Sequence, residues 1–147
     1  MKFPLILLIS FLPFLTNSLV AQVDKKIYQT MDIGDSTKQI NFDFSEGFDI
    51  VFWKQESKIM FEIAAHVEIN SREIVNKLVG DGRYTIVADN NGTIKTIKFR
   101  SRIPIKGVQG NVLNESLFTR VYIPEGFVIK NSVAYKADNL ILVENKK

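Results

Sequence analysis

The single histidine of the sequence, His66, is the side chain best suited to acid–base or metal chemistry, and its neighbours decide what it can do. Glu62 and Glu68 stand at even spacings from it, so an extended chain would present all three on one side. One imidazole and two carboxylates are a sparse ligand set, and residues two apart on a strand lie roughly 6.6–6.8 Å from each other, which splays their ligand atoms. We therefore interpret this face as solvated and expect no metal or other cofactor.

Other catalytic arrangements find few candidates. The chain has no cysteine, and no Gly-x-Ser-x-Gly turn presents a serine to His66. Asp43, Glu46 and Asp49 cluster around a glycine, and a glycosidase would hold two such carboxylates roughly 5–9.5 Å apart across a cleft. Acidic residues beside a glycine more commonly solvate a bend. We expect no enzyme, and a carboxylate-based hydrolase is the least favoured alternative.

A basic strip near residue 100 is the feature that points most directly to binding. Lys98, Arg100 and Arg102 recur at every second position, which places them on one side of an extended chain. Two further lysines, Lys95 and Lys106, flank them, and these five residues form the candidate binding site. Such a ridge suits an anionic glycan or the phosphates of lipopolysaccharide. The alternative is edge protection, in which cations keep a foreign strand from pairing, and the near-balanced charge favours it.

The totals of charged residues limit the partners. There are 19 Lys+Arg and 16 Asp+Glu, which gives a net charge of +3. A balance so close to neutral gives no reason to expect nucleic acid.

Strands are the elements expected to position these residues. Residues 59–69 alternate apolar and other side chains, which predicts a long strand with Ile63 and Val67 facing a core and Glu62 and His66 facing water. Further strands are predicted over residues 40–44, 48–53, 83–88, 93–100, 117–123, 127–130 and 139–143.

Turns and one helix complete the prediction. Asn91-Gly92 between two β-prone runs predicts a hairpin. The same stretch differs from a calcium-binding loop, because counting from Asp89 the glycine stands fourth rather than sixth. Asn70-Ser71-Arg72-Glu73 indicates a helix cap with Glu three residues after Asn70, and residues 71–79 predict a short helix. Residues 101–116 predict a long loop and 124–126 a tight turn. The fold class is therefore all-β: one domain over residues 22–147, either an antiparallel-rich β-sandwich or a short β-solenoid-like domain.

Residues 1–21 predict export. No charged side chain occurs from Phe3 to Val23, and the apolar run is shorter than the roughly 20 residues of a spanning helix. We expect a signal peptide cut between Ala21 and Gln22, with Ser18 as an alternative cut site and an uncleaved anchor less favoured. Because a lipoprotein needs a cysteine at the cut, we expect a secreted, periplasmic or outer-surface protein of a Gram-negative bacterium, neither a lipoprotein nor stably inserted in the membrane.

Two segments give the chain a resemblance to a known secreted group. Residues 48–53 precede a polar turn and the long alternating strand, and residues 120–131 hold a strand, Pro-Glu-Gly and a second strand. This arrangement, over residues 39–143, resembles the secreted β-strand-repeat proteins described as auto-transporter adhesin head-like domains. The resemblance implies a parallel stack of short strands and a role at the cell surface. It implies no catalytic residues.

These observations predict an exported, non-enzymatic β-module that binds at the cell surface or supports the envelope. Its expected partner is an anionic envelope glycan or a surface protein. The alternative is a periplasmic, lipocalin-like β-barrel that holds a small hydrophobic ligand, with some of the 11 phenylalanines lining the cavity. An enclosed apolar cavity of roughly 300 Å³ or more would favour that alternative.

Overall fold

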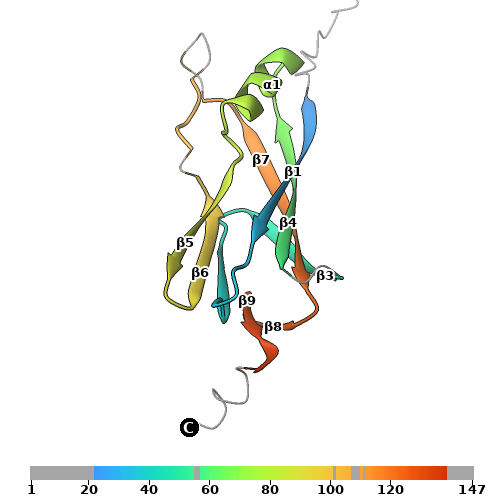
Figure 1. Ribbon diagram of the computed structural model, residues 1–147. Coiled ribbons are helices and arrows are strands. Elements are labelled where there is room, and N and C mark those ends of the chain that lie inside the picture. Colours follow the sequence, from blue (N-terminus) through green and yellow to red (C-terminus); the bar gives the residue numbers. More distant parts are fainter. Residues whose placement is uncertain (1–21, 55–56, 101, 107–109, 111, 139–147) are drawn as a thin grey trace, which may run out of the picture.

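The computed structural model describes residues 22–54, 57–100, 102–106, 110 and 112–138, and shows two β-sheets packed together (Figure 1). Sheet A has the strand order β1 (Val23–Asp32), β4 (Lys58–Val67), β7 (Glu115–Pro124) and β3 (Gly47–Trp53). Sheet B has the order β5 (Ile86–Asn91), β6 (Ile94–Phe99), β2 (Gln39–Asp43), β9 (Val133–Lys136) and β8 (Phe127–Lys130). The predicted signal peptide and the strand predicted over 139–143 lie outside the described residues.

Both sheets are mixed. β3 runs parallel to β7 and β2 runs parallel to β6, while the other neighbouring strands are antiparallel. The sheets remain separate layers and do not close into one cylinder. The prediction of an all-β, sandwich-like domain with one short helix is confirmed.

The core lies between the sheets, and the alternation of β4 builds its centre. Ile63 and Val67 are fully buried, whereas Glu62 and His66 face outward and are partly exposed, so the predicted register is confirmed. Sheet B contributes Ile40, Ile97 and Ala134 to the same cluster. Apolar side chains on alternate residues of every central strand make this burial possible, since each strand has one face toward the other sheet.

Two tight turns have different backbone solutions. The β5–β6 hairpin turns at Gly92-Thr93, where φ of Gly92 is 60°, the geometry of a type II′ turn. The hairpin is confirmed, although β5 runs on to Asn91 and the turn is shorter than expected. The β8–β9 hairpin turns at Asn131 and Ser132, whose φ values are 51° and 60°, as a type I′ turn requires. Strand β9 was not predicted, because Asn-Ser lacks the glycine that usually marks this turn.

Strand β1 was also missed, because its inward positions include polar residues. Val23, Ile27 and Met31 alternate inward, but Lys25 and Gln29 interrupt the apolar pattern. The Gln29 amide donates to the carbonyl of Ile86 over 2.5 Å and accepts from its N–H over 2.9 Å. This side chain therefore bonds to the first residue of β5 as a neighbouring strand would, and it links the edges of the two sheets.

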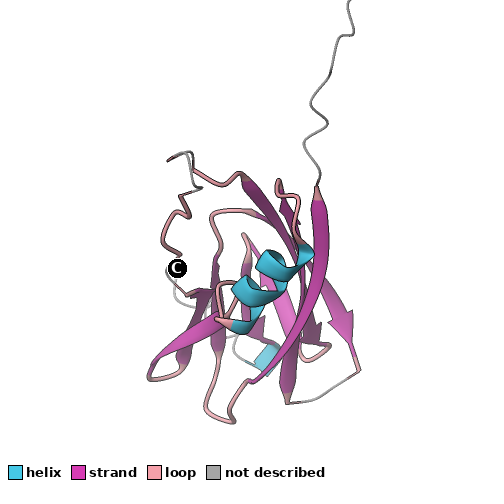
Figure 2. Ribbon diagram, turned by 90° about the horizontal axis from the view of Figure 1, so that it is seen from above, coloured by secondary structure: helices cyan, strands magenta, loops and turns pink. Residues whose placement is uncertain are grey.

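Helix α1 (Arg72–Gly80) lies at one end of the sandwich (Figure 2). The Ser71 hydroxyl accepts a hydrogen bond from the N–H of Ile74 over 3.4 Å, so the cap lies one residue after Asn70, from which the predicted cap was counted. Only Val75 of the helix is buried, and the Lys25 side chain of β1 donates to Asn76 over 2.9 Å. The residues that follow α1 carry Arg83 and Tyr84 toward the site described next.

Candidate functional site

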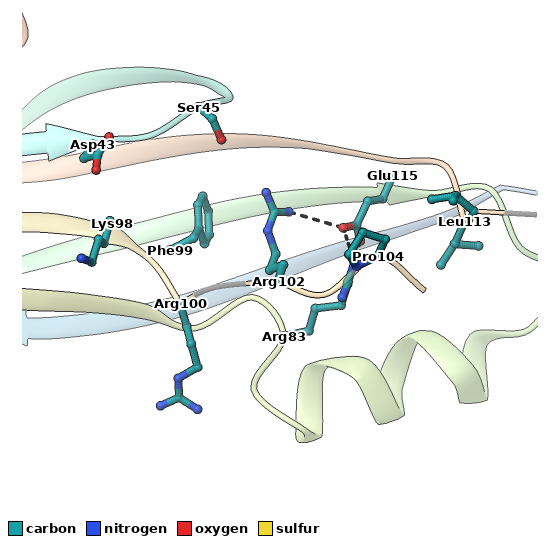
Figure 3. A pocket seen from close by; sticks show the side chains of 11 residues that line it. Asp43, Ser45, Arg83, Lys98, Phe99, Arg100, Arg102, Pro104, Leu113 and Glu115 are labelled. Carbon is teal, nitrogen blue, oxygen red and sulfur yellow. Dashed lines mark hydrogen bonds and ion pairs between the residues drawn. The ribbon is translucent and has the colours of Figure 1, made fainter. Parts of the chain in front are cut away.

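An open pocket of about 460 Å³ lies beside the end of β6, the β2–β3 connection and the start of β7 (Figure 3). Cations and apolar side chains dominate its lining. The cations are Arg83, Lys98, Arg100 and Arg102; the apolar residues are Phe99, Pro104, Val112 and Leu113; the remaining residues are Asp43, Ser45 and Glu115. We call this hollow the basic pocket. Three of the five residues of the predicted basic strip therefore line one site.

Glu115 is the anchor of the pocket. Its two carboxylate oxygens accept hydrogen bonds from Arg83 at 2.7 and 3.1 Å, a bidentate pair whose side chains are 11% and 13% exposed. The Tyr84 hydroxyl donates to the same carboxylate over 3.1 Å. Burial, together with this carboxylate, raises the pKa of Tyr84 to about 12, and the bond to Glu115 raises the pKa of Arg83. Both groups therefore stay protonated at neutral pH.

Arg102 turns into the pocket instead of joining an exposed ridge. Its guanidinium lies 5.1 Å from the centre of the Phe99 ring, within cation–π range. It also forms ion pairs with Glu46 and, over 3.5 Å, with Glu115, and its side chain is only 17% exposed. Figure 3 shows this side chain pointing toward Glu115. The expected alternation fails here because β6 ends at Phe99, so Arg100 and Arg102 lie outside the strand.

The other members of the strip have separate environments. Lys95 is 8% exposed and its ammonium donates to the carbonyl of Asp32 over 3.0 Å, so the expectation of an exposed flank was wrong for it. Lys98 pairs with Asp89, and that hydrogen bond raises the pKa of its ammonium. Lys106 is exposed but is not among the residues lining the pocket.

Arg100 is the cation most available to a ligand. Its residue is exposed, and it forms no ion pair with another residue that the structure describes. Figure 3 shows its side chain extending away from Glu115. The lining holds four cations and two carboxylates, a difference of two positive charges, before Glu46 and Asp89 are counted as counter-ions. Once those two are counted the charges balance, and Arg100 is the lining cation that has no ion-pair partner among the described residues.

The three carboxylates considered for hydrolysis have different environments. Asp43 lies at the end of β2 and lines the basic pocket, while Glu46 pairs with Arg102. Asp49 pairs with Arg120 over 3.1 Å on the outer face of sheet A. Of the three, only Asp43 is among the residues lining the basic pocket, so the geometry gives the hydrolase alternative no support.

His66 is likewise separated from the two glutamates. Its Nδ1 lies 2.6 Å from a carboxylate oxygen of Asp24, while Glu62 pairs with Lys26 over 2.9 Å and Glu68 accepts from Asn114 over 3.1 Å. In the described part of the chain, no group of three or more His, Asp or Glu side chains is placed to hold a metal ion.

Two further hollows, of about 380 and 490 Å³, also open to the surface. One lies over β1, β4 and β7, and the other beside Trp53 and the turn that joins β7 to β8. The enclosed apolar cavity that a lipocalin-like binder would need is not among these three hollows. Among the residues described, no helix has the length and apolar character needed to cross a membrane.

Sequence reasoning missed Arg83, Phe99 and Glu115 as site residues. Arg83 and Glu115 are 32 positions apart, and nothing local to either marks their pairing. The one local signal was Phe99, an aromatic residue between Lys98 and Arg100. Comparison with protein-family models, with curated proteins and with solved structures finds no match for this chain. The adhesin-like resemblance therefore stays a prediction, and the geometry of the pocket carries the functional argument.

Proposed function

We propose that this chain is an exported, non-enzymatic binding module of the cell envelope that holds an anionic glycan in the basic pocket. The observation that carries the proposal is the association of Arg102, stacked over Phe99, with Lys98 and Arg100 around one open hollow. A guanidinium binds a carboxylate, sulfate or phosphate through paired hydrogen bonds. The aromatic and proline side chains offer an apolar wall to the ring of a sugar.

The cations of the pocket fall into two groups, those that hold its shape and those that face the solvent. Arg83 and Arg102 are already satisfied by Glu115, which keeps the pocket in shape without a ligand. Lys98 and Arg100 lie on the solvent side, where an anionic group gains attraction at little cost in desolvation. Glu46 is the counter-ion that a ligand would displace from Arg102, because Glu46 lies on a connection between strands and pairs with no cation besides Arg102 among the described residues.

The test is to titrate the protein with oligogalacturonate, and separately with a neutral oligosaccharide of the same length for comparison. Replacing Lys98 and Arg100 with Gln should weaken oligogalacturonate binding about tenfold, because two solvent-exposed ion pairs contribute up to about 1 kcal/mol each and about 1.4 kcal/mol is tenfold. Added salt should weaken binding by the native protein. The matched control replaces Lys38 and Lys130, two exposed lysines outside the pocket, with Gln. Equal losses in both double variants, or equal affinity for the neutral sugar, would refute the proposal.

Export has its own test. Expressed with its full sequence in a Gram-negative host, the protein should be recovered outside the cytoplasm with Gln22 at its N-terminus, as measured by mass spectrometry of the intact chain. Recovery of a membrane-bound protein that retains residues 1–21 would contradict it.

A further inference from the structure

The four edge strands of the sandwich differ in how they are protected. Edges expose unpaired N–H and C=O groups, and proteins guard them with lysine, proline, short length or a covering element. β1 carries Lys25 and Lys26, β5 ends in Asp-Asn-Asn, and β8 has only four residues. β3, at the free edge of sheet A, has seven residues with no lysine, arginine or proline, and its only charge is Asp49 (Figure 1). Among the described residues, β3 is the longest edge strand without a cation or a proline, and apart from Asp49 its side chains are apolar.

Apolar side chains gather at this unprotected edge. Val51 and Phe52 of β3 are 37% and 48% exposed, and Phe118 on the neighbouring β7 is 44% exposed. Phe118 lies over Gly47, where an added Cβ would come within 3.3 Å of its ring. Trp53 stands beside the Tyr122 ring with 6.1 Å between ring centres. Exposed apolar surface continuous with an open strand edge is typical of a pairing interface.

We propose that β3 pairs antiparallel with β3 of a second copy of this chain, around a two-fold axis at Ile50. A two-fold axis between identical antiparallel strands is perpendicular to the sheet, so outward residues lie opposite outward residues. The axis at Ile50 pairs all seven residues and places Phe48 opposite Phe52. The two four-stranded sheets A would become one continuous sheet.

Charge selects this register over the one centred on Asp49. An axis at Asp49 would set the two Asp49 carboxylates directly opposite each other, which destabilises a strand pair. With the axis at Ile50, Asp49 lies opposite Val51 and keeps its ion pair with Arg120, so no carboxylate is left without a partner. Trp53 falls opposite Gly47, on the face where Phe118 lies. The pairing thus covers the exposed side chains of Val51, Phe52 and Phe118.

The two-fold register makes opposite predictions for two substitutions at one position. Val51→Glu sets a carboxylate opposite Asp49 at both symmetric sites, whereas Val51→Lys sets an ammonium there. Sedimentation equilibrium of the purified native protein should give a dimer mass near 100 µM that dissociates on dilution. Val51→Glu should raise the dimer dissociation constant about tenfold, and Val51→Lys should leave it unchanged or lower it at low salt.

The matched control is Val128→Glu, which changes a valine of similar exposure on the edge strand β8 of sheet B and should leave the dimer intact. Circular dichroism checks that each variant is folded. A native protein that remains monomeric at 100 µM would overturn the proposal. Equal weakening by Val51→Lys and Val51→Glu, no effect of Val51→Glu, or an equal effect of Val128→Glu would overturn it as well. A dimer would also present two basic pockets, although the pairing does not depend on their ligand.

Discussion

Replacing Glu115 with Gln should be among the most damaging conservative changes in this protein. The carboxylate joins Arg83, Arg102 and Tyr84, and its side chain is 13% exposed. Glutamine keeps the shape and one acceptor oxygen but leaves two guanidiniums without their shared negative charge. Removing one partner of a buried ion pair costs about 3–5 kcal/mol. The site opens onto a pocket, and Arg83 keeps its hydrogen bond to the carbonyl of Ile103. We therefore expect Glu115→Gln to lower the free energy of unfolding by about 2–4 kcal/mol.

The assay is thermal and urea unfolding at neutral pH. A loss of about 2–4 kcal/mol is a large share of the 5–15 kcal/mol typical of a domain, and it should lower Tm by about 8–15 °C. The control is Lys77→Gln, which breaks an ion pair whose side chains are 75% and 60% exposed and should cost below about 1 kcal/mol. If Glu115→Gln lowered stability no more than Lys77→Gln does, the view of Glu115 as the anchor of the pocket would be wrong.

Three further predictions concern the core, pH and the basic strip. Ile63→Asp should abolish cooperative unfolding, because it buries a carboxylate among apolar side chains, whereas Glu62→Gln should leave a folded protein by circular dichroism. The hydrogen bond from Lys26 lowers the pKa of Glu62 below 4.5, so its contribution to stability is present above pH 4.5 and is lost as pH falls through the lowered pKa. Urea unfolding at pH 6 and pH 3 should therefore show a smaller drop for Glu62→Gln than for the native protein. Arg102→Glu should lower Tm strongly, because it adds a third carboxylate beside two others, whereas Arg100→Glu should change Tm by at most a few degrees; similar melting of both would contradict the inward placement of Arg102.

Local features were predictable from the sequence. The register of β4 follows from alternation along one strand, and the helix from a polar cap segment followed by apolar residues at helical spacing. The β5–β6 hairpin follows from Asn-Gly between β-prone runs. Each of these patterns is complete within about ten residues, so no distant contact was needed to recognise it.

Long-range arrangement was not predictable in the same way. β7 and β8 follow each other across one turn but belong to different sheets, and the parallel partners β3 and β7 are far apart in the sequence. The apolar alternation of β1 is interrupted by Lys25 and Gln29, so its inward face was not recognised. Their polar groups form hydrogen bonds with Asn76 and with the backbone of Ile86. A polar residue can face inward once a distant partner receives it, and the partner is unknown until the chain is folded.

The basic strip separates the two kinds of information most clearly. Residue types and spacing by themselves determined that cations gather near residue 100, with an aromatic ring among them. Tertiary structure alone decided that Lys95 would donate to the carbonyl of Asp32 and that Arg102 would turn toward Glu115. The physical reason is that a charged side chain lies where its counter-charges and hydrogen-bond acceptors are, and here those come from β1, from the β2–β3 connection and from the start of β7.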